Sequence, residues 1–419
     1  MRVLTPHLFC VGGEDHNLRI PFLKAVVARG FRVSAAGTGA SKPFSEAGIE
    51  YRRYRLSRVF DPLGDRAALA ELTAVIRELR PTLLQCFDTK PDILVPFAAR
   101  AAGEIPVVST VTGLGWLYSS RSPLALSLRP PFLLAQRMAA RLTAHTVFQN
   151  QDDRAFFTRR RLVRDGLHSV IPGSGIDVAG FDAAVASGPS PESIRSALGL
   201  ADAPTVITVA RIAKEKGIRT LLEAAALVNL DAPNVRFLLV GQRETEGRRA
   251  ISKAEIDRHA PYVMALGPRS DVPSLLRAAD VFAFPTELRE GVPRALMEAC
   301  VAGLPAITTG MPGCVDVIRD AWSGLIVPQR SPRLLADAVL TLLRDRETAS
   351  TYAARASLRV RREMNLEAIA DGYVTAYGEV LHRAAPHAWQ GALQVPPESS
   401  TLTITSRTTS SEPSVSSGA

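Results

Sequence analysis

Short apolar runs alternate with amphipathic stretches along this chain, and the alternation occurs twice. In the first part, strand-like runs at 2–9, 31–37, 82–87, 106–111 and 145–150 are interrupted by helical patterns at 19–30 and 65–81. In the second part, strand-like runs at 205–210, 235–241, 262–267, 281–286, 305–309 and 324–327 are accompanied by helical patterns near 217–228, 272–279, 292–302 and 331–344. Strands that alternate with helices form parallel sheets covered on both faces, so the sequence predicts an α/β protein with two doubly wound, Rossmann-like domains.

The chain turns polar and glycine-rich around residues 171–181, which predicts a hinge near Pro172. We expect an N-terminal domain over 1–172 and a C-terminal domain over 173–364. A helix at 365–385 is expected to pack back on the N-terminal domain. Residues 386–419 are rich in Ser, Thr and Pro, which predicts a disordered tail. Ligands bind such sheets at the carboxyl ends of the strands, so the site is expected in the cleft between the domains.

The chain is basic, with a net charge of +9 and a pI of about 9.7. This charge favours an anionic partner, but the arginines are scattered among apolar helices and no nucleic-acid motif is visible, so nucleic acid is not expected. The four cysteines lack metal-ligand spacing, and neither a metal nor a cofactor is expected. No secretory signal and no apolar stretch of ~18 residues is visible, which predicts a cytoplasmic protein.

Two carboxylates accompany the helical pattern at 292–302. Pro293 suits the first turn of this helix, which places Glu290 at or just before the N-terminus, where free N–H groups attract phosphate. Glu298 follows about 12 Å further along at ~1.5 Å per residue. Two acceptors at this separation suit the two ends of one nucleoside diphosphate sugar; the alternative is that Glu298 is a solvated helix residue. Glu287 is interpreted as a loop residue in water.

Two cations follow the first strand of the second domain. Arg211 sits at the carboxyl end of that strand, and Lys216 opens the next helix together with Gly217. Both are expected to face the same cleft as the helix near Glu290, where fixed positive charge would neutralise a diphosphate leaving group. The alternative is an ordinary pair of surface cations.

The stretches VARIAKEKG (209–217) and FPTELREGVPRALMEACVAGLPAITT (284–309) resemble retaining glycosyltransferases of family 4, which have the GT-B fold. In that family an R-x4-K pair and an E-x7-E pair mark the donor site. The resemblance implies a metal-independent hexosyl- or N-acetylhexosaminyltransferase with catalytic residues Glu290, Lys216 and Arg211. It also implies that Arg211 and Lys216 bind the donor diphosphate, that Glu298 holds the ribose hydroxyls and that Glu290 faces the donor sugar. Further implied donor contacts are the backbones of Gly291, Val292, Gly12 and Gly13.

Other segments, including FDTKPDILVPFAARAAGEIPVVSTVTGLGWLYSS (87–120), are similar to the branch that extends polyprenyl-diphosphate-linked glycans in bacterial surface-glycan assembly. The resemblance implies a UDP-sugar donor and a lipid-linked acceptor. Many family members have a histidine after the strand equivalent to 82–87; this chain instead offers Asp88, Thr89 and Lys90. The general base stays unassigned, and we expect the leaving phosphate to take the acceptor proton. Further acceptor-side candidates are His16, Arg19, Gly113 and Gly115; the loop at 112–120 is alternatively a tight turn with buried aromatics.

The segment 121–145 combines arginines with a helical apolar face at Leu134, Met138 and Leu142. Such a face suits an anionic membrane surface, which predicts peripheral contact at the inner face of the cell membrane; alternatively, the helix packs on its sheet. Two other functions stay open at this point. One is a transferase with a soluble acceptor, and the other is a GT-B-fold nucleotide-sugar epimerase, against which R-x4-K with E-x7-E argues.

Overall fold

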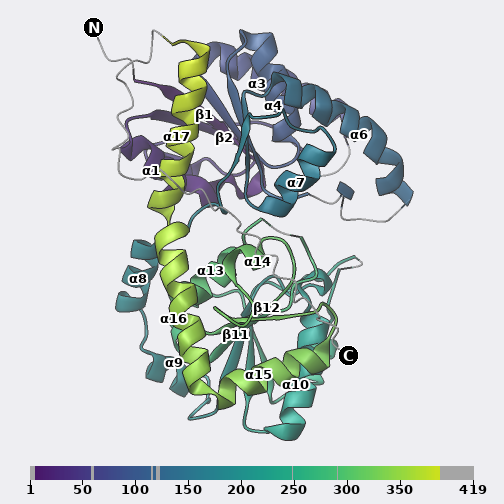
Figure 1. Ribbon diagram of the computed structural model, residues 1–419, viewed down its shortest axis with the longest axis vertical. Coiled ribbons are helices and arrows are strands. Elements are labelled where there is room, and N and C mark those ends of the chain that lie inside the picture. Colours follow the sequence, from purple (N-terminus) through teal and green to yellow (C-terminus); the bar gives the residue numbers. More distant parts are fainter. Residues whose placement is uncertain are drawn as a thin grey trace, which may run out of the picture.

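The computed structural model describes residues 5–57, 61–114, 117–118, 123–247, 249–289 and 291–386. The described chain forms two α/β domains, one above the other in Figure 1. Each domain is built on a parallel sheet, which confirms the predicted fold class. Glu290, Gly115 and residues 387–419 of the predicted tail lie outside the described residues.

The N-terminal sheet has the strand order β3-β2-β1-β4-β5-β6-β7. Its strands are β1 (His7–Val11), β2 (Arg32–Gly37), β3 (Glu50–Arg53), β4 (Leu83–Phe87), β5 (Val107–Val111), β6 (His145–Phe148) and β7 (His168–Val170). The connecting helices are η1 (Glu14–Arg19), α1 (Ile20–Ala28), α2 (Lys42–Glu46), α3 (Pro62–Leu79), α4 (Pro91–Ala102), α6 (Pro123–Leu142) and α7 (Gln151–Arg159). Apolar side chains of α3 and α4 fill one core against the sheet.

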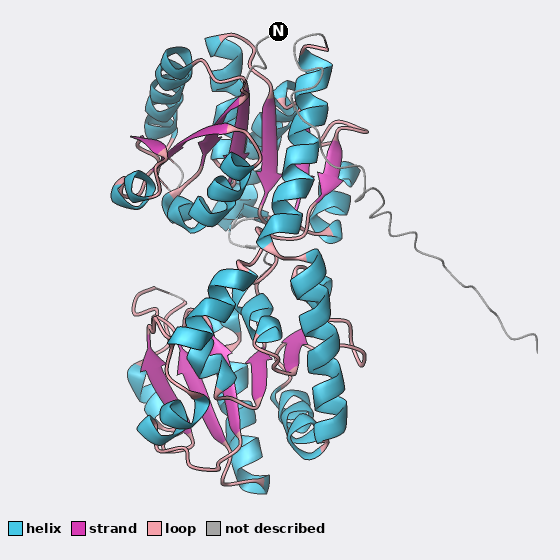
Figure 2. Ribbon diagram, turned by 90° about the vertical axis from the view of Figure 1, so that its left-hand side faces the viewer, coloured by secondary structure: helices cyan, strands magenta, loops and turns pink. Residues whose placement is uncertain are grey.

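The C-terminal sheet has the strand order β10-β9-β8-β11-β12-β13. Its strands are β8 (Thr205–Val209), β9 (Arg236–Val240), β10 (Val263–Gly267), β11 (Val281–Phe284), β12 (Ala306–Thr309) and β13 (Leu325–Val327). The helices are α8 (Val178–Ser187), α9 (Pro191–Ala197), η2 (Lys214–Lys216), α10 (Ile218–Asp231), α11 (Lys253–Asp257), α12 (Val272–Arg277), α13 (Arg294–Val301), α14 (Cys314–Val317) and α15 (Pro332–Arg344). Helices flank both sheets in the orthogonal view of Figure 2.

Two long helices, α16 (Arg346–Glu363) and α17 (Leu366–Ala384), run along one side of the molecule (Figure 1). Helix α17 lies against α1 of the N-terminal domain, where Arg29 pairs with Glu367 and Asp371 at 2.8 and 2.6 Å. Tyr373 and Tyr377 are buried in the N-terminal core, and the Tyr377 hydroxyl donates to Gln85 Oε1 at 2.9 Å. Helix α17, which follows the C-terminal domain in sequence, thus packs as part of the N-terminal domain.

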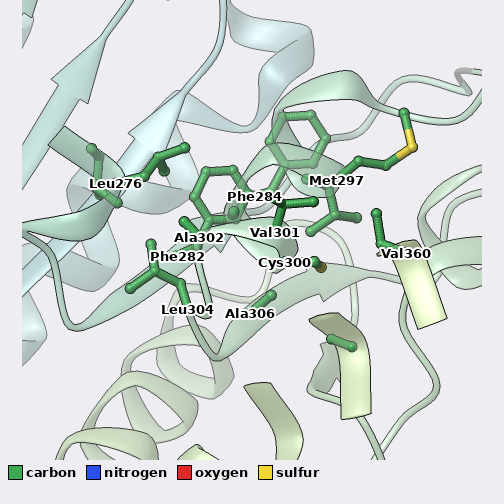
Figure 3. Packing of buried hydrophobic residues seen from close by; sticks show 14 of the residues in the cluster. Leu276, Phe282, Phe284, Met297, Cys300, Val301, Ala302, Leu304, Ala306 and Val360 are labelled. Carbon is green, nitrogen blue, oxygen red and sulfur yellow. The ribbon is translucent and has the colours of Figure 1, made fainter. Parts of the chain in front are cut away.

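A continuous apolar core fixes helix α13 on its sheet. Phe282 and Phe284 of β11 lie beside Met297 and Cys300 of α13, with Val360 of α16 on the far side (Figure 3). All four cysteines are buried and free, as expected for small apolar side chains. Because α13 buries so much of its surface here, packing sets its position relative to β11. The same packing fixes the point at which the loop between β11 and α13 ends.

Candidate active site

The carboxyl ends of two neighbouring strands bring the predicted donor residues together. Strands β8 and β11 pair in parallel, so the loops after them adjoin. The backbone N–H of Glu287, after β11, donates to the carbonyl of Glu215, after β8, at 2.9 Å. Residue 217 must be glycine here: its φ is +69°, and a Cβ would lie 1.8 Å from the Pro285 carbonyl oxygen. This tight contact holds the two loops as one unit.

The two predicted cations differ in exposure. Arg211 is half-exposed, and its guanidinium pairs with Glu215 at 3.6 Å and Glu244 at 3.3 Å. Lys216 is only 9% exposed, and its ammonium lies 5.7 Å from the centre of the Phe284 ring. Lys216 also directly precedes the N-terminal end of α10, where free N–H groups add positive potential. The pair can stabilise a diphosphate, with Lys216 as the pre-positioned charge.

Glu298 lies in the middle of α13 and is partly buried, with 17% of its side chain exposed. Its carboxylate accepts from Arg294 Nε at 2.9 Å, one helical turn earlier. It is therefore not the fully solvated helix residue of the alternative interpretation. Helix α13 begins at Arg294, and Pro293 is its N-cap residue rather than part of its first turn.

Glu287 differs from its interpretation as a loop residue in water. Its side chain is 16% exposed and accepts from Arg330 Nε at 2.6 Å. The ion pair joins the loop after β11 to the loop before α15. Glu287 thus helps to shape the loop that leads to Glu290.

Asp88 connects Arg19, another predicted acceptor-side residue, with Gly13, a predicted donor contact, and with Thr112 of the loop after β5. Its carboxylate accepts from the Gly13 N–H at 3.1 Å, from Thr112 Oγ1 at 3.4 Å and from Arg19 Nη2 at 3.5 Å. Arg19 also lies 3.9 Å above the Phe87 ring. Asp88 has a φ of +79°, a left-handed conformation that costs a non-glycine residue ~1–3 kcal/mol and is concentrated at functional sites.

A hollow of about 360 Å³ opens beside Asp88. Thr89 and Lys90 line it together with Gly13, Glu14, Asp15, Thr38, Leu56, Ser57, Asp88 and Pro91. Lys90 pairs with Asp65 at 2.6 Å, which fixes its ammonium at the wall. The mixture of carboxylates, hydroxyls and one ammonium suits a ligand rich in hydroxyl groups. The three candidates that replace the family's histidine thus share one hollow.

His16 does not face this hollow. Its side chain is 1% exposed, and its ring stacks on the Phe44 ring with 5.5 Å between the ring centres. The ring also lies so close to Gly12 that a Cβ on residue 12 would be 2.2 Å from His16 Nδ1. Burial, followed by the nearby Arg19 cation, lowers the pKa of His16 to about 3. The proposed contact of His16 with an acceptor is therefore corrected: a neutral, buried ring cannot reach a ligand. Gly12 is small because the histidine ring occupies the space beside it.

The buried His16 predicts a loss of stability in acid. A pKa below the ordinary value means that the folded protein prefers neutral histidine, so its stability is complete above about pH 6.5 and declines toward pH 3. At ~1.4 kcal/mol per pH unit, His16 contributes a loss of about 2 kcal/mol between pH 7 and pH 5. Urea unfolding of His16→Gln should show a pH dependence smaller by about that amount. His382→Gln, on the exposed face of α17, is the control, and an unchanged pH dependence in His16→Gln would contradict the prediction.

The loop after β5 is only partly described. Gly113 has a φ of +145°, and the carbonyl oxygen of Thr112 faces the C-terminal domain near Gly291. The Tyr118 ring packs edge-on against Phe132 and Phe156, at 5.9 and 5.0 Å. The packing of Tyr118 therefore favours the alternative interpretation of the loop at 112–120 as a turn with packed aromatic side chains.

Contacts between the domains involve residues that the sequence analysis did not assign. A Cβ on Gly291 would lie 2.0 Å from Gln149 Oε1, and a Cβ on Gly173 of the hinge 2.9 Å from the Val292 side chain. Ser174 of the hinge accepts from both Arg19 and Gln149 at 3.1 Å. Apart from the bond between Gln149 and Ser174, which spans 25 residues, these partners come from segments more than a hundred residues apart, so no local pattern reports them.

The chain is similar to known glycosyltransferases in sequence and to solved structures in fold. Residues 191–359 match the family "Glycosyl transferases group 1". The chain is 25% identical over 375 residues to the N,N'-diacetylbacillosaminyl-diphospho-undecaprenol alpha-1,3-N-acetylgalactosaminyltransferase of Campylobacter jejuni, covering 88% of this chain and 97% of that one. It is 28% identical over 275 residues to the UDP-Gal:alpha-D-GlcNAc-diphosphoundecaprenol alpha-1,3-galactosyltransferase of Escherichia coli, covering 65% and 69%. Anabaena HepE, solved with UDP and glucose, superposes with a TM-score of 0.74 at 19% identity over 89% and 100% of the chains.

Proposed function

We propose that this chain, whose C-terminal domain belongs to the group 1 glycosyl transferases, moves a sugar from a UDP-linked donor to a polyprenyl-diphosphate-linked glycan. The relatives from Campylobacter jejuni and Escherichia coli are named for undecaprenol-linked acceptors, and the second is named for a UDP-Gal donor. One observation carries the proposal: the loop after β8, which holds Arg211 and Lys216, is bonded to the loop between β11 and α13 at the ends of two paired strands. This junction faces the N-terminal domain, which holds the hydroxyl- and carboxylate-lined hollow.

The proposed reaction retains the configuration of the transferred sugar. An acceptor hydroxyl attacks the anomeric carbon from the face that the diphosphate leaves. The bond between that carbon and the diphosphate oxygen breaks, and the departing phosphate oxygen takes the hydroxyl proton. Lys216 and Arg211 stabilise the negative charge that develops on the diphosphate, while Glu290 and the backbones of Gly291 and Val292 face the donor sugar. Gly12 and Gly13, after β1 of the N-terminal domain, are proposed to contact the donor through their backbones.

The transfer reaction is tested with UDP-sugars and a synthetic polyprenyl-diphosphate-linked glycan. The double variant Glu290→Ala/Lys216→Ala should lose transfer, and full activity in it would refute the assignment. Incubation with donor alone separates the alternatives, because an epimerase would form a new sugar without acceptor. Replacing the lipid-linked acceptor by its soluble glycan tests the second alternative.

The proposed reaction is metal-independent, because two side-chain cations supply the positive charge at the diphosphate. Across the described residues, no group of three or more His, Cys, Asp or Glu side chains could hold a metal ion. We expect transfer to continue at an unchanged rate after dialysis against excess EDTA. Loss of transfer with EDTA, restored by Mg²⁺ or Mn²⁺, would contradict metal independence while leaving the transferase assignment intact.

Glu298 is proposed to bind the ribose of the donor, which predicts a binding defect when its charge is removed. A hydrogen bond to a charged group contributes ~1.5–3 kcal/mol, so Glu298→Gln should raise the donor KM about tenfold or more with little change in kcat. Calorimetric titration with UDP should show the same loss. Glu363→Gln is the matched control, because Glu363 on α16 also pairs with an arginine four residues earlier, Arg359, at 3.3 Å. Equal UDP affinity in Glu298→Gln and the wild type would refute the ribose contact.

Peripheral contact with a membrane is proposed for α6, in a cytoplasmic protein at the inner face of the membrane. Leu124, Leu134 and Met138 on α6 are 61%, 59% and 46% exposed. A hollow beside its C-terminal end is lined by four arginines, Arg137, Arg141, Arg161 and Arg164, and none of them pairs with a carboxylate among the described residues. Apolar side chains beside unpaired cations suit anionic lipid. Among the helices that the structure describes, none is long and apolar enough to cross a membrane.

The membrane proposal is tested by sedimentation with liposomes. The protein should bind vesicles containing phosphatidylglycerol at low salt and should not bind pure phosphatidylcholine vesicles. Arg137→Glu combined with Arg141→Glu should abolish binding, while Arg258→Glu on the C-terminal domain should leave it unchanged. No binding to the anionic vesicles would refute the proposal.

A further inference from the structure

An ion pair between the two domains involves a residue that the proposed reaction leaves unassigned. Arg289 Nη2 donates to Asp153 Oδ1 at 3.1 Å. Asp153 lies in the first turn of α7 in the N-terminal domain, and Arg289 lies in the loop between β11 and α13 of the C-terminal domain. The two residues are 136 positions apart. Arg289 directly precedes Glu290 and Gly291, so the pair acts on the loop that carries the proposed catalytic carboxylate.

Asp153 is held rigidly within its own domain. Its side chain is 1% exposed. The N-cap residue Asn150, itself fully buried, accepts from the Asp153 N–H at 2.7 Å and donates from Nδ2 to Asp153 Oδ2 at 2.9 Å. The Oδ2 atom of Asp153 therefore accepts a hydrogen bond from within the N-terminal domain, and its Oδ1 atom accepts one from Arg289. A buried carboxylate without a cation is unfavourable, so this geometry favours the arrangement in which Arg289 is present.

The same loop contacts the N-terminal domain at a second point. Gly291 lies so close to Gln149 and to the Thr112 carbonyl oxygen that a Cβ there would be 2.0 and 2.9 Å from them. Gln149 lies between β6 and α7, and Asp153 lies in the first turn of α7, so neighbouring residues of the N-terminal domain make both contacts. Residue 290 is thus flanked on each side by a contact with the other domain.

We propose that the Asp153–Arg289 ion pair is an interdomain latch that positions the loop carrying Glu290 for sugar transfer. Both are positioning residues: neither is assigned a contact with substrate, and they act through the loop. The inference rests on the proposed function, because the loop it positions is the proposed donor-side loop. When the domains separate, water replaces the pair, so the latch favours the closed arrangement without making it permanent.

The latch is tested with Asp153→Asn, Arg289→Ala and the double variant. Each single change should lower kcat about 10- to 50-fold while the affinity for UDP stays within twofold, because Arg211, Lys216 and Glu298 are unchanged. The kcat of the double variant should be no lower than that of the less active single variant, since both changes break the same interaction. Arg289→Lys should restore part of kcat. Asp152→Asn, one residue away on the exposed side of α7, and Arg361→Ala, which breaks a pair within the C-terminal domain, should keep full turnover.

A second measurement does not depend on activity. Small-angle scattering, with protein alone and with saturating UDP, should give a larger radius of gyration for both latch variants than for the wild type. Superimposable scattering curves together with a kcat within twofold of the wild type would overturn the latch. Absence of transfer in the wild type with every donor, combined with a larger radius in the variants, would instead overturn the proposed function and leave the latch standing.

Discussion

Replacing Lys216 by methionine is expected to lower kcat/KM about 10²- to 10³-fold, the size of effect seen when one pre-positioned group that stabilises transition-state charge is removed. Lys216 is 9% exposed and lies next to Gly217, the N-cap residue of α10, so its charge is held in place before the donor binds. Methionine keeps the length and apolar stem of lysine and suits a position 5.7 Å from the Phe284 ring. The melting temperature should therefore stay the same or rise while activity falls.

The matched control for this prediction is Lys214→Met, two residues earlier in η2. It removes an identical charge from the same turn and should keep kcat/KM within about twofold. Lys216→Arg should also be poorly active, because a planar guanidinium does not fit a site shaped for a compact ammonium. A kcat/KM of Lys216→Met within fivefold of the wild type would show that Arg211 alone neutralises the diphosphate.

The sheets were largely predictable because their central strands are buried on both faces and appear in the sequence as apolar runs. The predictions missed the two edge strands of the N-terminal sheet. Strand β3 (Glu50–Arg53) is polar and half-exposed, and β7 (His168–Val170) has three residues, so neither forms an apolar run. The strand expected at 2–9 corresponds to β1 at His7–Val11, and residues 2–4 of that expectation lie outside the described residues. Pro6 has no N–H, and pairing with β2 begins where its carbonyl accepts from the Arg32 N–H at 2.9 Å.

The candidate site was predictable only where its residues follow one another in sequence. The R-x4-K pair lies in one loop, and Glu298 lies on a helix of recognisable period. Asp153, which lies in the first turn of α7, shows the limit of prediction from the sequence. The partner of Asp153 depends on how two separately folded domains meet, which hydrophobic periodicity within either domain does not encode. Glu287 and its partner Arg330 lie in two loops of one domain, 43 residues apart, so no local pattern reports that pair either.

Gly291→Ala is expected to reduce kcat about 10- to 100-fold, although alanine keeps the backbone N–H proposed to face the sugar. The added Cβ would lie 2.0 Å from Gln149 Oε1 and 2.9 Å from the Thr112 carbonyl oxygen, distances at which atoms must move apart. Gln149 can turn away, but the Thr112 oxygen belongs to the backbone. The domains therefore separate by a small distance, and displacements of about 1 Å can cost ~10² in rate. Because each domain keeps its own core, the melting temperature and the affinity for UDP should change little.

Gly310→Ala provides the control within the same domain, since its added Cβ would approach no heavy atom closer than Ile326 Cγ2 at 3.8 Å. It should retain wild-type kcat. Combining Gly291→Ala with Gln149→Ala removes the closer of the two contacts and should restore part of the lost turnover. The residual defect then measures the contact with the Thr112 carbonyl. If Gly291→Ala instead turns over at the wild-type rate, the close approach of the two domains at this loop is not required for transfer, and the loop must complete the site from the C-terminal domain alone.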